Sequence, residues 1–113
     1  GGTQGNASAA WTNGAAGKFG SSMSFDGTDD YITVPNVDRN TLTFCACVKR
    51  GRINAPAGTD RLIASVSNGG WAVAFDSPKN RLFLSWVGTD AAYSTGTITD
   101  TTNWHYIVVT YNG

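Results

Sequence analysis

Residues 17–35, GKFGSSMSFDGTDDYITVP, decide the fold class of this 113-residue chain. Two short segments of alternating apolar and polar residues flank a turn-forming Asp-Gly pair, which is the pattern of a β-hairpin. The apolar residues on one face of each segment are Met23, Phe25, Ile32 and Val34. We therefore expect a hairpin that turns within residues 26–30, with Phe25 and Ile32 buried.

Alternation of apolar and polar residues along the rest of the chain predicts five further strands. They are residues 42–49, 61–67, 70–76, 80–87 and 103–111. We expect residues 1–16 to form an extended arm or edge strand anchored by Trp11, and residues 89–102 to be irregular. No stretch shows the period of about 3.6 residues that marks an amphipathic helix. The sequence therefore predicts an all-β chain, an antiparallel β-sandwich of jelly-roll type that forms one domain over residues 1–113.

The predicted strand over residues 103–111 carries bulky side chains on both faces, with Tyr106 on one and Ile107 on the other. Such a strand is expected in the middle of a sheet, covered on both sides. It is followed by the turn-forming pair Asn112-Gly113 with no returning strand. We therefore expect a sandwich that is incomplete at both ends, as a piece of a longer protein. The isolated residues should need the continuation of their own chain, or a strand from a neighbouring chain, to fold stably.

Charge and hydropathy exclude two classes of partner. The formal net charge is zero and 14% of the residues are charged, whereas binding to nucleic acid needs a concentrated surplus of Lys and Arg. No apolar run approaches the roughly 18 residues that span a bilayer. We therefore expect neither a nucleic-acid partner nor a membrane span.

Three stretches together resemble the laminin-G-like domains of the concanavalin A-like lectin/glucanase superfamily. Residues 17–35 show the pattern G-x-x-G-x-x-x-x-F-D-G-x-x-D-Y-I-x-V-P. Residues 42–50, LTFCACVKR, resemble a second strand of that family, which usually has Trp at the position of Cys47. Residues 103–113, NWHYIVVTYNG, resemble its W-H-x-V-x-V-T-Y-[DN]-G strand and turn. The resemblance implies a β-sandwich that serves as a binding or adhesion module in a secreted, cell-surface or virion-surface protein.

The acidic residues argue against catalysis. Glucanases of this superfamily place two Glu and an Asp on one strand, and retaining hydrolysis needs two carboxyl groups about 5–5.5 Å apart. All eight acidic residues of this chain are Asp, with no Asp-x-Asp pair. The Gly-x-Ser-x-Gly elbow of serine hydrolases is also absent from the sequence. A zinc site of Cys45, Cys47 and His105 would lack an evident fourth ligand. We therefore expect that the chain is not an enzyme.

Three carboxylates, Asp26, Asp29 and Asp30, lie within five residues of one another in a Gly-containing loop. Carboxylate and backbone carbonyl oxygens are the ligands that calcium takes. The alternative interpretation is an ordinary Asp-Gly turn with solvated neighbours. Calcium at this loop is the one cofactor that the sequence leads us to consider.

Glycan sites combine exposed aromatic rings, which pack on the apolar faces of pyranoses, with polar groups that bond the hydroxyls. Trp71, Trp86 and Tyr93 are the aromatic candidates, and Asn68 is the polar one. Each ring also occupies a position suited to core packing, and the sequence leaves open which ring is exposed. Two functions remain open: a glycan-binding or adhesion module, and a packing module between subunits of a phage particle or extracellular filament, with no sugar site.

Two further groups allow two interpretations each. Cys45 and Cys47 share one face of a predicted strand, with Cα atoms about 6.6–6.8 Å apart, at the limit for a disulfide. They fit a strained disulfide or buried free thiols that pack as small apolar residues. The basic residues 49–52 fit a solvated turn or an anion site.

Overall fold

The computed structural model describes residues 11–25, 27, 30–35, 41–56, 58–65, 70–86 and 89–113 of the chain. The chain forms two compact units, Gly1–Pro35 and Asn36–Gly113. The described residues form strands and no helix, and every strand pair is antiparallel. The prediction of an all-β chain is therefore confirmed.

In the first unit, β1 (Trp11–Gly17) pairs with β2 (Gly20–Met23) as a hairpin with a two-residue turn. Glycine is required on both sides of this turn. A Cβ atom added to Gly17 would collide with the backbone carbonyl oxygens that follow the turn, and Gly20 has a φ of 102°, which residues with a side chain rarely adopt. Residues 1–16 were expected to form an extended arm or edge strand. Residues 11–16 of this segment lie in β1, and residues 1–10 lie outside the described residues.

The predicted hairpin that turns within residues 26–30 has no paired strands among the described residues, and residues 26, 28 and 29 of its turn lie outside them. β2 ends at Met23, and residues 31–34, expected as the second strand, belong to no sheet. Phe25 is 48% exposed and Ile32 is 54% exposed, so the expectation that both are buried is wrong. Alternation along a segment indicates a strand only where a partner strand and an apolar layer are available to pair and cover it.

The exposure of Phe25 leads to a specific expectation about stability. Phe25→Ala is expected to lower the free energy of unfolding by less than about 1 kcal/mol, because substitutions at exposed positions usually have small effects. Urea unfolding followed by tryptophan fluorescence measures this change. A loss of about 3–5 kcal/mol, the range for a core Phe, would show that the ring is buried.

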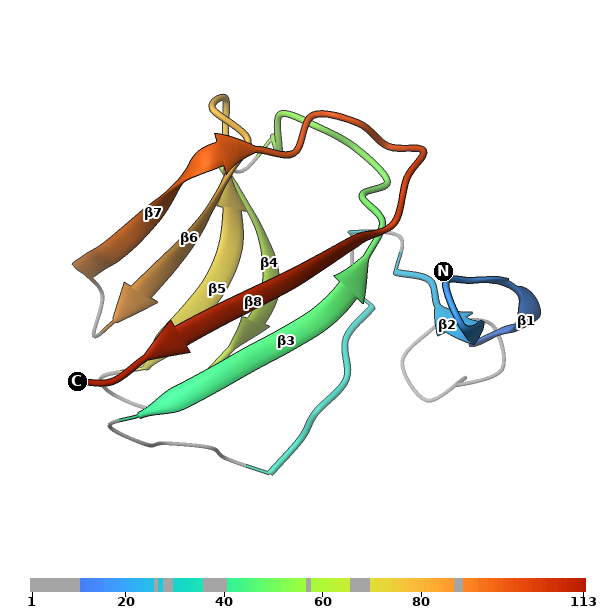
Figure 1. Ribbon diagram of the computed structural model, residues 1–113, viewed down its shortest axis with the longest axis horizontal. Coiled ribbons are helices and arrows are strands. Elements are labelled where there is room, and N and C mark those ends of the chain that lie inside the picture. Colours follow the sequence, from blue (N-terminus) through green and yellow to red (C-terminus); the bar gives the residue numbers. More distant parts are fainter. Residues whose placement is uncertain are drawn as a thin grey trace. The chain divides into compact units, whose positions relative to one another are not determined.

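The second unit contains two antiparallel sheets, which Figure 1 shows as two layers. β3 (Leu42–Val48) and β8 (His105–Tyr111) pair without a break in register as a two-stranded sheet. β3 begins where predicted, since its apolar and polar residues alternate without interruption, and it ends one residue earlier than predicted, at Val48. β8 begins two residues later than predicted.

The other sheet has the strand order β4-β5-β6-β7. Its strands are β4 (Thr59–Ala64), β5 (Trp71–Asp76), β6 (Arg81–Trp86) and β7 (Thr89–Thr97). The first three overlap predicted strands, whereas β7 lies in a segment that we expected to be irregular. That expectation is wrong because pairing with β6, through a register that shifts twice, holds a polar segment extended despite its composition.

Side chains from both sheets form one core. Its buried centre is Trp71, Val73 and Leu84, and Val73 has no exposed surface. The apolar residues packed around them are Leu42, Phe44, Val109 and Tyr111 from β3 and β8, and Leu62, Ile63, Leu82 and Trp86 from the larger sheet. Fully burying a side chain such as Val or Leu contributes about 1.5–3 kcal/mol. This shared core holds the two sheets face to face as the predicted β-sandwich.

The face of β8 that is turned away from the core is open. Tyr106 is 69% exposed and Val108 is 52% exposed, whereas Ile107 and Val109 point into the sandwich. Among the strands that the structure describes, β8 pairs with β3 alone. The prediction that this strand lies in the middle of a sheet with both faces covered is therefore wrong for the described residues.

Candidate functional site

The outer face of the four-stranded sheet carries the candidate site. Leu82 and Leu84 of β6 point into the core, so alternation turns Arg81 and Phe83 outward. Phe83 lies directly opposite Tyr93 of β7, which places the two rings on the same face. We define the Tyr93 surface as the outward group of Asp76, Arg81, Phe83 and Tyr93.

Tyr93 is held by two neighbours on this surface. Its ring stacks on that of Phe83, with centroids 5.5 Å apart and an interplanar angle of 28°. The guanidinium carbon of Arg81 lies 4.1 Å from the Tyr93 ring centroid. Aromatic and cation–π contacts of this kind contribute about 0.5–1.5 kcal/mol each. Tyr93 nevertheless remains 41% exposed, so the sheet presents a positioned aromatic ring to solvent.

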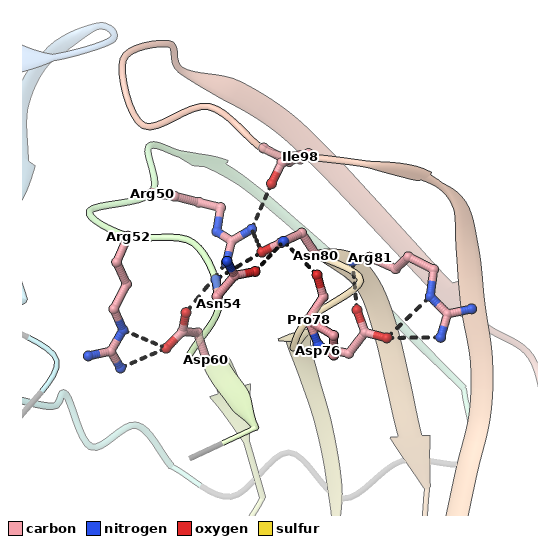
Figure 2. Close-up of polar contacts among 9 residues, drawn as sticks. All are labelled: Arg50, Arg52, Asn54, Asp60, Asp76, Pro78, Asn80, Arg81 and Ile98. Atoms are coloured by element: carbon pink, nitrogen blue, oxygen red, sulfur yellow. Dashed lines mark hydrogen bonds and ion pairs between the residues drawn. The ribbon is translucent and has the colours of Figure 1, made fainter. Parts of the chain in front are cut away.

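Arg81 is fixed in turn by Asp76. Its Nε and Nη2 atoms donate to Asp76 Oδ2 at 3.2 and 2.8 Å, and its backbone N–H donates to Asp76 Oδ1 at 2.7 Å (Figure 2). Burial raises the pKa of Asp76, but the hydrogen bonds and the charge of Arg81 together outweigh burial and hold that pKa below its usual range. Asp76 is therefore ionised at neutral pH and compensates the charge of Arg81.

The structure separates the residues that the sequence offered as glycan contacts. Trp71 is 6% exposed and belongs to the core. Trp86 lies on the core-facing side of β6 and stacks on Tyr111 with centroids 4.3 Å apart. Asn68 lies outside the described residues. Of the three candidate rings, Tyr93 is the one placed on an outer face of the sandwich.

Sequence reasoning missed the partners of Tyr93. Asp76 and Arg81 bracket the turn between β5 and β6, a spacing that would allow a salt bridge across the turn to be proposed. Phe83 follows Arg81 by two residues and therefore shares its face. What the sequence does not contain is the register between β6 and β7, and without it Tyr93 cannot be assigned to either face.

The calcium prediction rests on Asp26, Asp29 and Asp30. Asp30 is half-buried, and the other two lie outside the described residues. Within the described part of the chain, no three His, Cys, Asp or Glu side chains are grouped so that they could hold a metal ion. Calcium binding therefore stays a prediction. Its test is whether a chelator lowers the melting temperature, since an ion bound only to the folded state stabilises it.

A second polar cluster joins three loops of the sandwich around Arg50 (Figure 2). Arg50 is 6% exposed, and its Nη1 donates to Asn80 Oδ1 at 2.9 Å and to the carbonyl oxygen of Ile98 at 2.6 Å. Asn80 Nδ2 donates to Asn54 Oδ1 and to the carbonyl oxygen of Pro78, both at 2.9 Å. Asn54 and Asn80 have φ angles of 59° and 55°, a left-handed conformation that asparagine tolerates better than most residues.

The cluster continues to Asp60. Arg50 Nη2 lies 3.5 Å from Asp60 Oδ2, and Arg52 donates to Asp60 Oδ1 from Nε at 3.1 Å and from Nη2 at 2.7 Å. Among the described residues, every buried side-chain nitrogen and oxygen has a partner. For residues 49–52 the sequence offered two interpretations, a solvated turn or an anion site. Arg50 fits neither, because its donors are used inside the sandwich.

Asp100 organises the turn that leads into β8. Its Oδ1 accepts the backbone N–H of Asn103 at 2.8 Å and that of Thr102 at 3.2 Å, and its Oδ2 lies 2.7 Å from His105 Nε2. The Asn103 N–H lowers the pKa of Asp100 most, partial burial opposes this, and His105 and Thr102 lower the pKa further. The contacts of His105 are therefore those of a residue that secures a turn.

Asp100→Asn is expected to flatten the acid limb of the stability profile. The pKa of Asp100 in the folded chain is below its unfolded value of about 3.9, so the ionised carboxylate stabilises the fold above that value. This contribution is lost as the pH falls through the folded-state pKa. Below about pH 4, the free energy of unfolding should fall more steeply for the wild-type chain than for the variant. Urea unfolding across this range measures both slopes, and equal slopes would contradict the assignment.

Cys45 and Cys47 are free thiols on the outer side of β3, the first exposed and the second half-buried. The expectation of buried thiols is wrong because, in the part of the chain that the structure describes, no layer covers this side of the two-stranded sheet. The thiols are therefore accessible to reagents and to ligands.

The chain matches a known family over the whole second unit and the last ten residues of the first. A laminin G family model, described as the concanavalin A-like lectin/glucanases superfamily, matches residues 26–113, which include all six strands from β3 to β8. No curated protein and no solved structure gave a match. Laminin G-like domains are generally non-catalytic binding modules and typically occur in extracellular proteins. No helix in the described part of this chain has the length and apolar character needed to cross a membrane. The chain belongs to the concanavalin A-like lectin/glucanase superfamily as a laminin G-like domain.

Proposed function

We propose that the chain is a non-catalytic glycan-binding or adhesion module of a secreted, cell-surface or virion-surface protein, and that the Tyr93 surface is its ligand site. The observation that carries this proposal is the exposed ring of Tyr93, positioned by Phe83 and Arg81. A ring that is fixed before the ligand arrives loses little conformational freedom on binding. The apolar face of a pyranose is a suitable surface to pack against it.

The charge balance of the Tyr93 surface favours a neutral glycan. Arg81 already donates from Nε and Nη2 to Asp76 Oδ2, so an acidic sugar would have to displace Asp76 to accept from the same two donors. It would also approach the Asp76 carboxylate. Sugar hydroxyls can instead donate to the carboxylate and accept from the remaining N–H groups of Arg81, which is 26% exposed.

Affinity electrophoresis through gels that contain neutral or acidic polysaccharides tests this proposal. We expect retardation in at least one neutral gel, and a loss of affinity of at least about tenfold in Tyr93→Ala, as for the truncation of an aromatic anchor. Tyr93→Phe should keep the interaction because the ring remains.

The matched control is Tyr106→Ala, which removes an exposed tyrosine from the outer face of the other sheet and should leave the retardation unchanged. Retardation by acidic gels alone, or equal effects of Tyr93→Ala and Tyr106→Ala, would contradict the proposal.

A second candidate function is a packing module within an assembly. It is favoured by the two-stranded sheet: among the described strands, β3 and β8 each have one unpaired edge, and Tyr106 and Val108 are exposed beside it. An unpaired edge next to apolar side chains is a template for a further strand. That strand would come from the continuation of the same polypeptide or from a neighbouring chain.

Sedimentation and thermal unfolding of the 113 residues in isolation test the need for such a strand. Concentration-dependent association, or a broad unfolding transition, would support the packing module. A monomer with a sharp, cooperative transition would contradict it and leave the glycan-binding proposal unaffected.

A further inference from the structure

The outer face of the β3–β8 sheet carries two accessible thiols next to each other along one strand. Cys45 and Cys47 are two residues apart in β3, so their side chains point to the same side of the sheet, opposite to the core-facing Phe44. The strand register places Val108 across from Cys45 and Tyr106 across from Cys47. Cys45 is exposed and Cys47 is half-buried, so neither sulfur is locked in the core.

The residues across from the two thiols lie on the same open side of the sheet. Val108, across from Cys45, is 52% exposed, and Tyr106, across from Cys47, is 69% exposed. Both thiols and their cross-strand neighbours therefore lie on one face of the two-stranded sheet.

We propose that Cys45 and Cys47 form a two-thiolate site for a soft d10 metal ion, represented by Cu(I). Thiolates select such ions, whereas calcium and magnesium take oxygen ligands. In the described part of the chain no third His, Cys, Asp or Glu side chain joins the pair. The site therefore suits an ion that accepts two ligands better than zinc, which takes four.

The spacing of the two residues distinguishes this site from a disulfide. The rise of a strand separates the Cα atoms of alternate residues by about 6.6–6.8 Å, at the upper end of the range that a disulfide spans. An ion held between two sulfur atoms bridges a wider gap than a sulfur–sulfur bond. The strand can therefore bind the ion without changing its backbone.

The net charge of the proposed Cu(I) complex is compatible with the residues that surround the two thiols. Each thiol gives one proton to solvent, so one Cu(I) and two thiols yield a bis-thiolate complex with one net negative charge and two released protons. Lys49 continues the alternation two residues beyond Cys47, and its Nζ lies 6.0 Å from the centroid of the Trp104 ring. The outward residues at the other end of the strand pair are Thr43 and Thr110, which are uncharged. The nearest formal charge along this row is thus positive.

Anaerobic titration of the reduced 113-residue chain with Cu(I), in competition with a chromophoric Cu(I) chelator, tests the proposal. We expect one ion per chain and two protons released per ion. Cys45→Ser and Cys47→Ser should each weaken binding by on the order of 10²–10⁴-fold, because each variant loses the advantage of a second tethered ligand. Two ions per chain, or single variants with unchanged affinity, would show independent thiols and overturn the proposal.

Thiol alkylation with mass spectrometry provides a second measurement on the same samples. One equivalent of Cu(I) should protect both cysteines together, whereas protection of one alone would overturn the two-thiolate site. Far-ultraviolet circular dichroism checks that the Ser variants keep the fold. Tyr93→Ala is the matched control and should bind Cu(I) as the wild-type chain does. Tyr93 lies in the four-stranded sheet, whereas the thiol site lies in the two-stranded sheet and does not depend on glycan binding.

Discussion

Replacing Arg50 with alanine is expected to lower the free energy of unfolding by about 3–5 kcal/mol, the range for removing one partner from a buried charged cluster. The Arg50 side chain is 4% exposed and donates to Asn80 and to the Ile98 carbonyl. Its guanidinium carbon also lies 4.4 Å from the centroid of the Phe75 ring. Without the guanidinium, buried acceptors of two loops lose a donor, and an unsatisfied buried polar group is costly.

Urea unfolding monitored by tryptophan fluorescence measures this loss. Arg52→Ala is the matched control, because Arg52 donates to the same Asp60 but its side chain is 45% exposed. Exposed ion pairs contribute about 0–1 kcal/mol, so the control should change stability little. Arg50→Lys keeps the charge without the planar fork and should be intermediate. Equal, small losses in Arg50→Ala and Arg52→Ala would contradict the structural role of Arg50.

Phe75→Ala is the second substitution for which we expect a large effect, about 3–5 kcal/mol, as for the removal of a core Phe ring. Phe75 is 1% exposed and lies in β5, between two paired neighbours in the four-stranded sheet. The same unfolding measurement applies, with the exposed Phe25→Ala as the control. A loss below about 1 kcal/mol would mean that the ring is not in the core.

A double-mutant cycle connects these two predictions. Because Arg50 and Phe75 are in contact, the losses from Arg50→Ala and Phe75→Ala should not add, and the difference should fall in the range of about 0.5–3 kcal/mol seen for contacting residues. Additive losses would show that the guanidinium and the ring are independent.

The parts of the fold that the sequence predicts are those set by local alternation. β3 has an uninterrupted apolar and polar pattern, and its predicted bounds agree with the structure to within one residue. β5 and β6 are joined by a turn whose composition marks it clearly, residues 77–80. In these segments one face meets the core, so the pattern of side chains and the packing agree.

The parts that the sequence does not predict depend on pairing between distant segments. β7 is polar, and its extended conformation comes from its partner β6. Phe25 has the local pattern of a strand residue, but the pattern does not show whether a partner is present. Arg50 contacts Asn80 and Ile98, which are 30 and 48 residues away, so no local signal marks it as buried.

The candidate site also has features that the local sequence predicts and features that depend on pairing between distant strands. Aromatic residues are easily identified as candidates, and Tyr93 was among them. The assignment of Tyr93 to the outer face and of Trp86 to the core face requires the strand registers, which a single sequence does not provide. The thiol pair was visible as a shared face of one strand, but its exposure depends on which layer covers that face.

The most direct test of glycan binding at the Tyr93 surface is a nuclear magnetic resonance titration. The ¹⁵N-labelled chain is titrated with the neutral oligosaccharide corresponding to the polysaccharide that retards it. We expect amide shift changes concentrated in β6 and β7 around Phe83 and Tyr93, and their loss in Tyr93→Ala. Shift changes confined to β3 and β8, or changes that persist in Tyr93→Ala, would contradict the assignment of the ligand site to this face.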